Sequence, residues 1–169
     1  NVPLTHYPVE RYDRIVKTLT EDQLRAACRV AGVHVHVGMP DHETAMAVYN
    51  EVIKSFKYLC QIGATEERLI EYCKVTMDKS ERMNIFEKHL MTSFIPPAYE
   101  GWRAFYQRAI DEGFVSDPRR LWDFIRISKH GTIEFRMFDT TADVDQIVFW
   151  ASVCHGICRL AMERVPALV

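Results

Sequence analysis

Two short segments with a strict alternation of apolar and polar residues constrain this fold more than any other feature. The first, 32–38, reads GVHVHVG, and the second, 126–136, reads RISKHGTIEFR. A period of two predicts a β-strand with one apolar and one polar face. The polar faces would carry two histidines on one strand and a carboxylate and arginines on the other. Such a sheet is equipped for a cation and an anion together, which suggests metal-assisted chemistry on a phosphate.

The same alternation assigns a face to each residue of the strands. The core face is expected to hold the apolar residues Val33, Val35, Val37, Ile133, Phe135 and Met137. The opposite face is expected to hold the polar residues His34, His36, Thr132, Glu134 and Arg136. Lys129–Gly131 separates two alternating runs and predicts a hairpin connection, with Gly131 available for positive φ.

Helical spacing of apolar residues surrounds these strands. We expect helices over about 9–30, 41–62, 102–113 and 143–165, with shorter ones between 65 and 90. Asp41 and Asp143 are placed as N-caps, and Thr20 as a local restart within the first helix. The order of elements does not repeat a βαβ unit. The predicted fold class is therefore α+β, an antiparallel sheet flanked by helices.

Length and composition bound the class of protein. The chain has 169 residues, of which 48% are hydrophobic, and its formal net charge is −2. This predicts a single domain over 1–169 with a real core. No basic stripe of the kind that nucleic-acid binding needs is present, so we expect a small-molecule partner. No apolar run approaches the ~20 residues of a membrane span, and the first residues lack a signal-peptide layout.

The cysteines argue against a disulfide scaffold or a zinc knuckle. There are five, an odd number, without CxxC spacing. Cys154 and Cys158 lie four residues apart in a predicted helix, so they either bind metal or pack as small apolar side chains. Core packing is the favoured interpretation. The expected location is a reducing, cytoplasmic one.

The two strands supply candidate ligands for both charges. His34 and His36 share a strand face, and Glu134 is the carboxylate that completes a metal site of ordinary chemistry. Arg126 and Arg136 match phosphate or carboxylate oxygens. The alternatives are surface histidines and a solvated ladder of cross-strand salt bridges. An unrelated metal hydrolase is a further hypothesis, disfavoured because few carboxylates accompany the histidines.

Two motifs resemble a known family. The stretch 28–39 resembles the G-x-HVHVG segment of the type 2 glutamate–cysteine ligase family, the carboxylate–amine ligases. The stretches 122–128 and 130–140 look like its W-D-x-R-P-S and G-T-x-E-x-R-x-x-D-T block. The order of the motifs and the hydrophobic helix between them also match.

The resemblance implies a glutamine-synthetase-like fold that binds ATP and Mg²⁺ or Mn²⁺. The implied reaction joins a glutamate-like carboxylate to an amine through an acyl phosphate. By resemblance, His34 and Glu134 would hold the metal, and Arg126 and Arg136 would be catalytic contacts of phosphoryl or carboxylate oxygens. Cofactor contacts would come from His36, Arg126 and Ser128, and His36 would be either a further metal ligand or a contact of phosphate and substrate. The aromatic residues Trp102, Phe105, Tyr106, Phe114 and Trp122 either wall an adenine pocket or, the favoured interpretation, pack in the core.

Some family features are missing from this chain. No acidic pair replaces the upstream G-x-E-x-E strand, the serine-rich segment is absent, and Ile127 stands where the R-P-S motif has proline. We therefore expect the central or C-terminal portion of a larger ligase, acting as a homo-oligomer or assembled with a missing N-terminal portion. The other hypotheses are a split site, a divergent relative, and a non-catalytic binding domain that retains the ligase fold.

Overall fold

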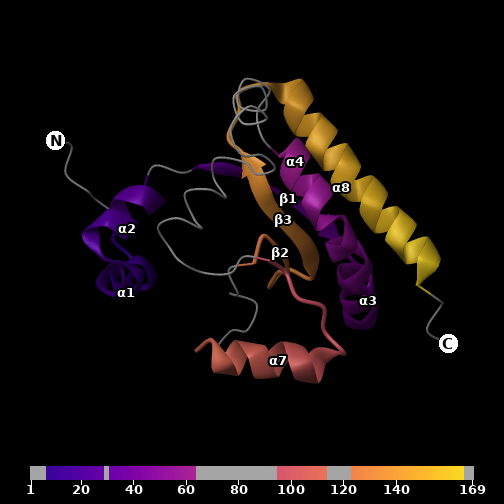
Figure 1. Ribbon diagram of the computed structural model, residues 1–169, viewed down its shortest axis with the longest axis horizontal. Helices are drawn as coiled ribbons and strands as arrows, with labels where there is room; N and C mark the ends of the chain where they lie inside the picture. Colours follow the sequence, from indigo (N-terminus) through magenta and orange to yellow (C-terminus); the bar gives the residue numbers. More distant parts are fainter. Residues whose placement is uncertain (1–6, 29–30, 64–94, 114–122, 166–169) are drawn as a thin grey trace.

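The computed structural model describes residues 7–28, 31–63, 95–113 and 123–165 (Figure 1). The first of these ranges contains α1 (Glu10–Thr18) and α2 (Glu21–Ala27). The following elements are β1 (Gly32–Gly38), α3 (His42–Val52), the 3₁₀ turn η1 (Ile53–Ser55) and α4 (Phe56–Ile62). The remaining elements are α7 (Trp102–Asp111), β2 (Ile125–Ile127), β3 (Thr132–Asp139) and α8 (Val144–Arg164).

The helix boundaries follow local capping chemistry. Asp41 accepts the Thr44 N–H at 2.8 Å, and Asp143 accepts the N–H of Asp145 at 2.9 Å, so both predicted N-caps are confirmed. Thr20 and Gln23 exchange side-chain-to-backbone hydrogen bonds in a capping box, which confirms the restart between α1 and α2. The helices expected between 65 and 90 lie outside the described residues.

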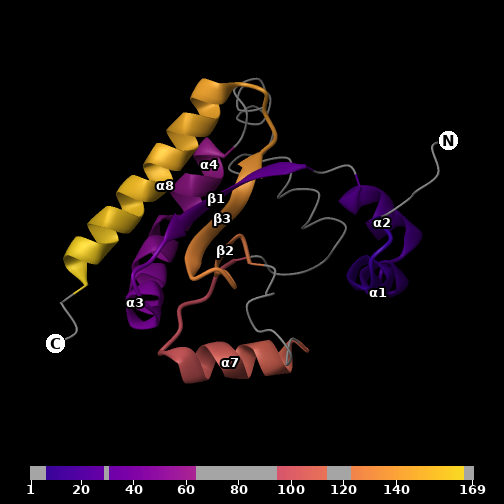
Figure 2. The same ribbon diagram turned by 180° about the vertical axis from the view of Figure 1, so that it is seen from behind.

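The three strands form one antiparallel sheet in the order β1-β3-β2. α3 and α8 run side by side over one face of it, as Figures 1 and 2 show from opposite sides. In both views α1 and α2 lie on the far side of the sheet from α8. The α+β prediction, an antiparallel sheet flanked by helices, is confirmed.

Burial of large apolar side chains between the sheet and these helices makes the core. Val35 pairs with Phe135 and Val37 with Ile133, and each pair packs in the core cluster as the alternation predicts. Leu59 and Cys154 bring α4 and α8 into the same cluster. Each fully buried aliphatic or aromatic side chain contributes roughly 1.5–3 kcal/mol through removal of its surface from water.

A β-bulge interrupts the register between β1 and β3, although Met137 is buried in the core as predicted. If the register of β1 and β3 were unbroken, Val33 would pair with Met137; it pairs with Phe138 instead. The extra residue in β3 shifts the alternation, because a bulge sets two residues against one. Phe138 therefore takes the core position and stacks on Trp150 of α8, with ring centroids 5.0 Å apart. Met137 is fully buried as well.

The described helices are not membrane spans. None of them combines the length and the hydropathy needed to cross a bilayer, although α8 has 21 residues. The described cysteines Cys28, Cys60, Cys154 and Cys158 are free thiols. Burial raises the pKa of the Cys158 thiol to about 12, as expected of a small side chain packed in the core.

Candidate active site

Strand pairing places three polar residues in one row across the sheet. His36 of β1 lies directly opposite Glu134 of β3, and Arg126 of β2 lies opposite Glu134 on its other side. Neighbouring strands are ~4.8 Å apart, so side chains in one row on one face contact each other. The row brings a histidine, a carboxylate and an arginine from two distant segments together.

Both oxygens of Glu134 have basic partners. Oε2 accepts a hydrogen bond of 2.7 Å from Arg126 Nε. Oε1 lies 3.3 Å from His34 Nδ1, 3.8 Å from His36 Nε2 and 3.5 Å from Arg136 Nε. Glu134 is only 3% exposed, whereas a carboxylate in a surface ladder of salt bridges would be in contact with water.

The surroundings of Glu134 favour its ionised form. Burial opposes ionisation, but the hydrogen bonds from His34 and Arg126 and the charge of Arg136 outweigh it and lower the pKa to about 2. Burial also lowers the pKa of His36, against the pull of the Glu134 charge. At neutral pH the site therefore presents a carboxylate beside a neutral His36.

The hairpin that joins β2 and β3 contacts the ring of His36. The Gly131 N–H donates to the Ser128 carbonyl at 3.2 Å, and Gly131 itself has φ +69°, so the connection is a tight turn that ends in a left-handed glycine. Its strands present two hydroxyls: Thr132 Oγ1 lies 2.8 Å from His36 Nδ1 and 2.7 Å from Ser128 Oγ. Ser128 is buried, and its predicted cofactor contact stays a prediction.

The predicted site residues thus come together on one side of the sheet. His34, His36, Arg126, Glu134 and Arg136 all lie within one cluster of direct contacts. Among the described residues, no group of three or more histidines, cysteines and acidic residues is arranged to hold a metal. The donors that fit a divalent cation are the ring nitrogen of His34 and Oε1 of Glu134, so a full coordination shell needs additional ligands.

A cavity of about 680 Å³ adjoins the hairpin. Ser128–Gly131 and the start of α3 form part of its wall, and Trp102 and Tyr106 of α7 form another part. Two of the five aromatic residues considered above therefore line a cavity, whereas Phe105 is buried in the core. The other two, Phe114 and Trp122, lie outside the described residues.

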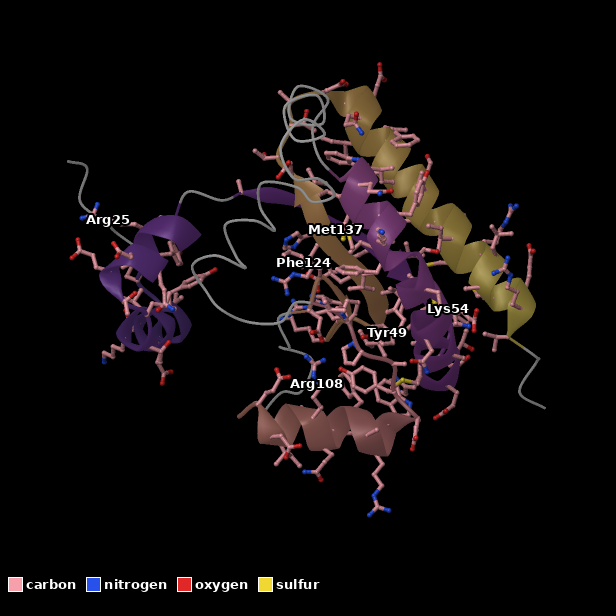
Figure 3. The ribbon with its side chains drawn as sticks, viewed as in Figure 1. Arg25, Tyr49, Lys54, Arg108, Phe124 and Met137 are labelled. Carbon is pink, nitrogen blue, oxygen red and sulfur yellow. The ribbon has the colours of Figure 1, made fainter. Side chains whose placement is uncertain are left out.

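Sequence reasoning missed a clamp between α7 and Asp123. Arg108 of α7 donates two hydrogen bonds to Asp123, at 2.5 and 2.8 Å, and a third of 2.6 Å to the Tyr99 hydroxyl. Figure 3 shows Arg108 reaching from α7 toward the sheet. Asp123 is 2% exposed, and burial raises its pKa in spite of the pairing. The W-D motif was the available signal, but nothing in it named Arg108 as the partner.

The chain is similar to known ligases. Residues 2–158 match the family described as "Putative amidoligase enzyme". The chain is 28% identical over 155 residues to "Putative glutamate–cysteine ligase 2" of Solibacter usitatus, covering 89% of this chain and 39% of that protein. It is 34% identical over 138 residues to the glutamate–cysteine ligase of Halobacterium salinarum, covering 79% and 38%, and 28% identical over 168 residues to that of Haloferax volcanii, covering 97% and 46%.

The chain therefore spans less than half the length of these relatives. The family match covers most of the chain, including both strands of the candidate site. The resemblance drawn from the two motifs is confirmed. This chain belongs to the amidoligase family, a family of ligase-type enzymes.

Proposed function

We propose that this chain is part of an ATP-dependent carboxylate–amine ligase with a glutamine-synthetase-like fold. The amidoligase family and the glutamate–cysteine ligases among its relatives support the reaction class. The observation that carries the proposal is the position of Glu134, with two imidazoles and Arg136 around one oxygen and Arg126 at the other. A site that must bind a nucleotide phosphate together with its cation needs both kinds of group.

In this proposal His34 and Glu134 hold Mg²⁺ or Mn²⁺, whose charge would offset that of the phosphates. Arg126 and Arg136 are the catalytic contacts of phosphoryl or carboxylate oxygens, because the guanidinium is planar and permanently charged. Hydrogen bonding to Glu134 keeps Arg126 in a fixed orientation before any ligand binds. Such preorganisation lowers the reorganisation required in the transition state.

The proposed substrates are ATP, a glutamate-like carboxylate and an amine. The carboxylate oxygen would take the γ-phosphoryl group, releasing ADP, and the amine nitrogen would then displace phosphate from the acyl carbon to form the amide. The cavity lined by Trp102, Tyr106, Ser128 and Lys129 is the proposed place for the nucleotide base. His36 lies near its wall, with its ring centroid 6.3 Å from that of His130. We further propose a cytoplasmic location, supported by the free thiols among the described cysteines.

The test measures the melting temperature of the full chain with and without Mg-ATP. A ligand at about 100 times its Kd stabilises a protein by ~2.7 kcal/mol, so binding raises the melting temperature. His34→Ala and Glu134→Ala should abolish this rise. Glu112→Gln changes an exposed carboxylate on α7 and should keep it. The rise, not the absolute melting temperature, is compared, because Glu134→Ala is itself destabilising.

A second measurement separates a ligase from a non-catalytic binding domain. Hydroxylamine replaces the amine and traps an acyl phosphate as a hydroxamate. Hydroxamate that forms only with ATP, Mg²⁺ and a carboxylate substrate supports the ligase. A melting-temperature rise without hydroxamate points to a binding domain, and a rise that survives both site variants overturns the site assignment.

A further inference from the structure

A chain of hydrogen bonds leads from the hairpin backbone to the ring of His36. The His130 N–H donates to Ser128 Oγ at 3.1 Å. Ser128 Oγ lies 2.7 Å from Thr132 Oγ1, which lies 2.8 Å from His36 Nδ1. Ser128 is 3% exposed, so the middle of this chain is shielded from water. We call Ser128, Thr132 and His36 the hydroxyl relay.

Counting the hydroxyl protons and their acceptors shows which group donates in each hydrogen bond of the relay. Ser128 Oγ already accepts the backbone N–H, and among its contacts with described residues the acceptor for its own proton is Thr132 Oγ1. Thr132 then has its own proton to donate, and its remaining contact is His36 Nδ1. If Thr132 donated to Ser128 instead, the proton of the buried Ser128 hydroxyl would have no acceptor among these contacts, which is unfavourable.

The contact on the other edge of the His36 ring is consistent with Thr132 as the donor to Nδ1. His36 Nε2 faces Oε1 of Glu134 at 3.8 Å. A carboxylate oxygen attracts an N–H and repels a nitrogen lone pair. If Nδ1 accepts from Thr132, the proton of the neutral ring is on Nε2, and the N–H points at Glu134. The contacts on both edges of the ring thus favour the same tautomer.

We propose that Ser128 and Thr132 are positioning residues that hold His36 in its Nε2–H tautomer. His36 then offers the site a hydrogen-bond donor and no lone pair, so it contacts an anion and is not a metal ligand. By the same reasoning Nδ1 of His34, 3.3 Å from the same Oε1, carries the proton of that ring, so the lone pair left for a metal ion is on its Nε2. That the anion is a phosphoryl oxygen rests on the proposed function; the tautomer does not.

The tautomer is measured directly by NMR. The full chain is labelled with ¹⁵N-histidine, and long-range ¹H–¹⁵N correlations are recorded without ligand at a pH above 7. The ring signals that disappear in His36→Gln identify His36. We expect Nδ1 in the unprotonated range and Nε2 in the protonated range. An Nδ1–H tautomer, or equal populations of the two, overturns the proposal in the wild-type protein alone.

Matched variants of Thr132 test the cause. Thr132→Val removes the hydroxyl and keeps the shape, and it should abolish the tautomer preference; Thr132→Ser keeps the hydroxyl and should retain it. A preference that persists in Thr132→Val contradicts the relay. Mg-ATP affinity should fall roughly 10-fold in Thr132→Val and stay close to wild type in Thr132→Ser. If no variant binds Mg-ATP, wild type included, the proposed function fails while the NMR result still decides the tautomer.

Discussion

Arg126 and Glu134 lie directly opposite each other on β2 and β3, and Arg126 Nε donates to Glu134 Oε2 at 2.7 Å. This bond engages one carboxylate oxygen from the hairpin side. The second oxygen is left to face the histidines of β1. The buried carboxylate of Glu134 thus contacts side chains from both neighbouring strands, and its ionisation affects the stability of the protein.

Stability should fall in acid because of Glu134. Folding lowers its pKa from 4.5 to about 2, so between these values the unfolded chain binds a proton that the folded chain does not. The stabilisation is complete above pH 4.5 and is lost as the pH falls toward 2. Urea unfolding at several pH values should show this loss in the wild type. Glu134→Gln should be less stable at pH 7 and should show a flatter profile in this window; an equally steep one would contradict the assignment.

The clamp of Arg108 allows a comparison of two carboxylates on one guanidinium. Asp123 is 2% exposed, whereas the side chain of Glu112, which accepts from Arg108 Nε at 2.7 Å, is 40% exposed. Asp123→Asn removes the buried one of the two charges that pair with Arg108 and should cost about 3 kcal/mol of unfolding free energy. Glu112→Gln should cost much less, because water screens an exposed pair. Chemical denaturation measures both, and equal costs would show that burial does not govern this pair.

Substitution by alanine should change the stability of the protein in opposite directions at two glycines. Gly131 has φ +69°, a conformation that alanine adopts poorly, so Gly131→Ala should destabilise the protein by about 1 kcal/mol. Gly156 lies within α8, and a Cβ there would meet nothing within 4 Å. Gly156→Ala should therefore stabilise by up to about 1 kcal/mol. Gly131→Asn is the control, since asparagine tolerates positive φ. Thermal unfolding distinguishes the signs.

The sequence predicted what local patterns determine. Alternation in 32–38 gave a strand with valines inward and histidines outward, and Asp143 gave the start of α8. These features depend on period and on one cap, both of which are visible in a few neighbouring residues. The convergence of His34, His36 and Glu134 followed once the two strands were assumed to pair.

What the sequence did not reveal depends on partners far along the chain. The bulge opposite His34 arises from how β3 fits β1 and α8 together, and no residue in β3 marks it. The partner of Asp123 is one arginine on α7, whose spacing resembles that of any exposed helical charge. The direction of the hydroxyl relay needed interatomic distances.

The strand order has a consequence for how the site forms. β3 is central in the sheet but is the last of the described strands along the chain, and Thr132 follows His36 by 96 residues. Contacts of such long range form slowly, because a long loop must close first. During synthesis, β1 leaves the ribosome well before its partner exists. Every nascent chain that stops short of β3 therefore carries the two histidines without the carboxylate they face.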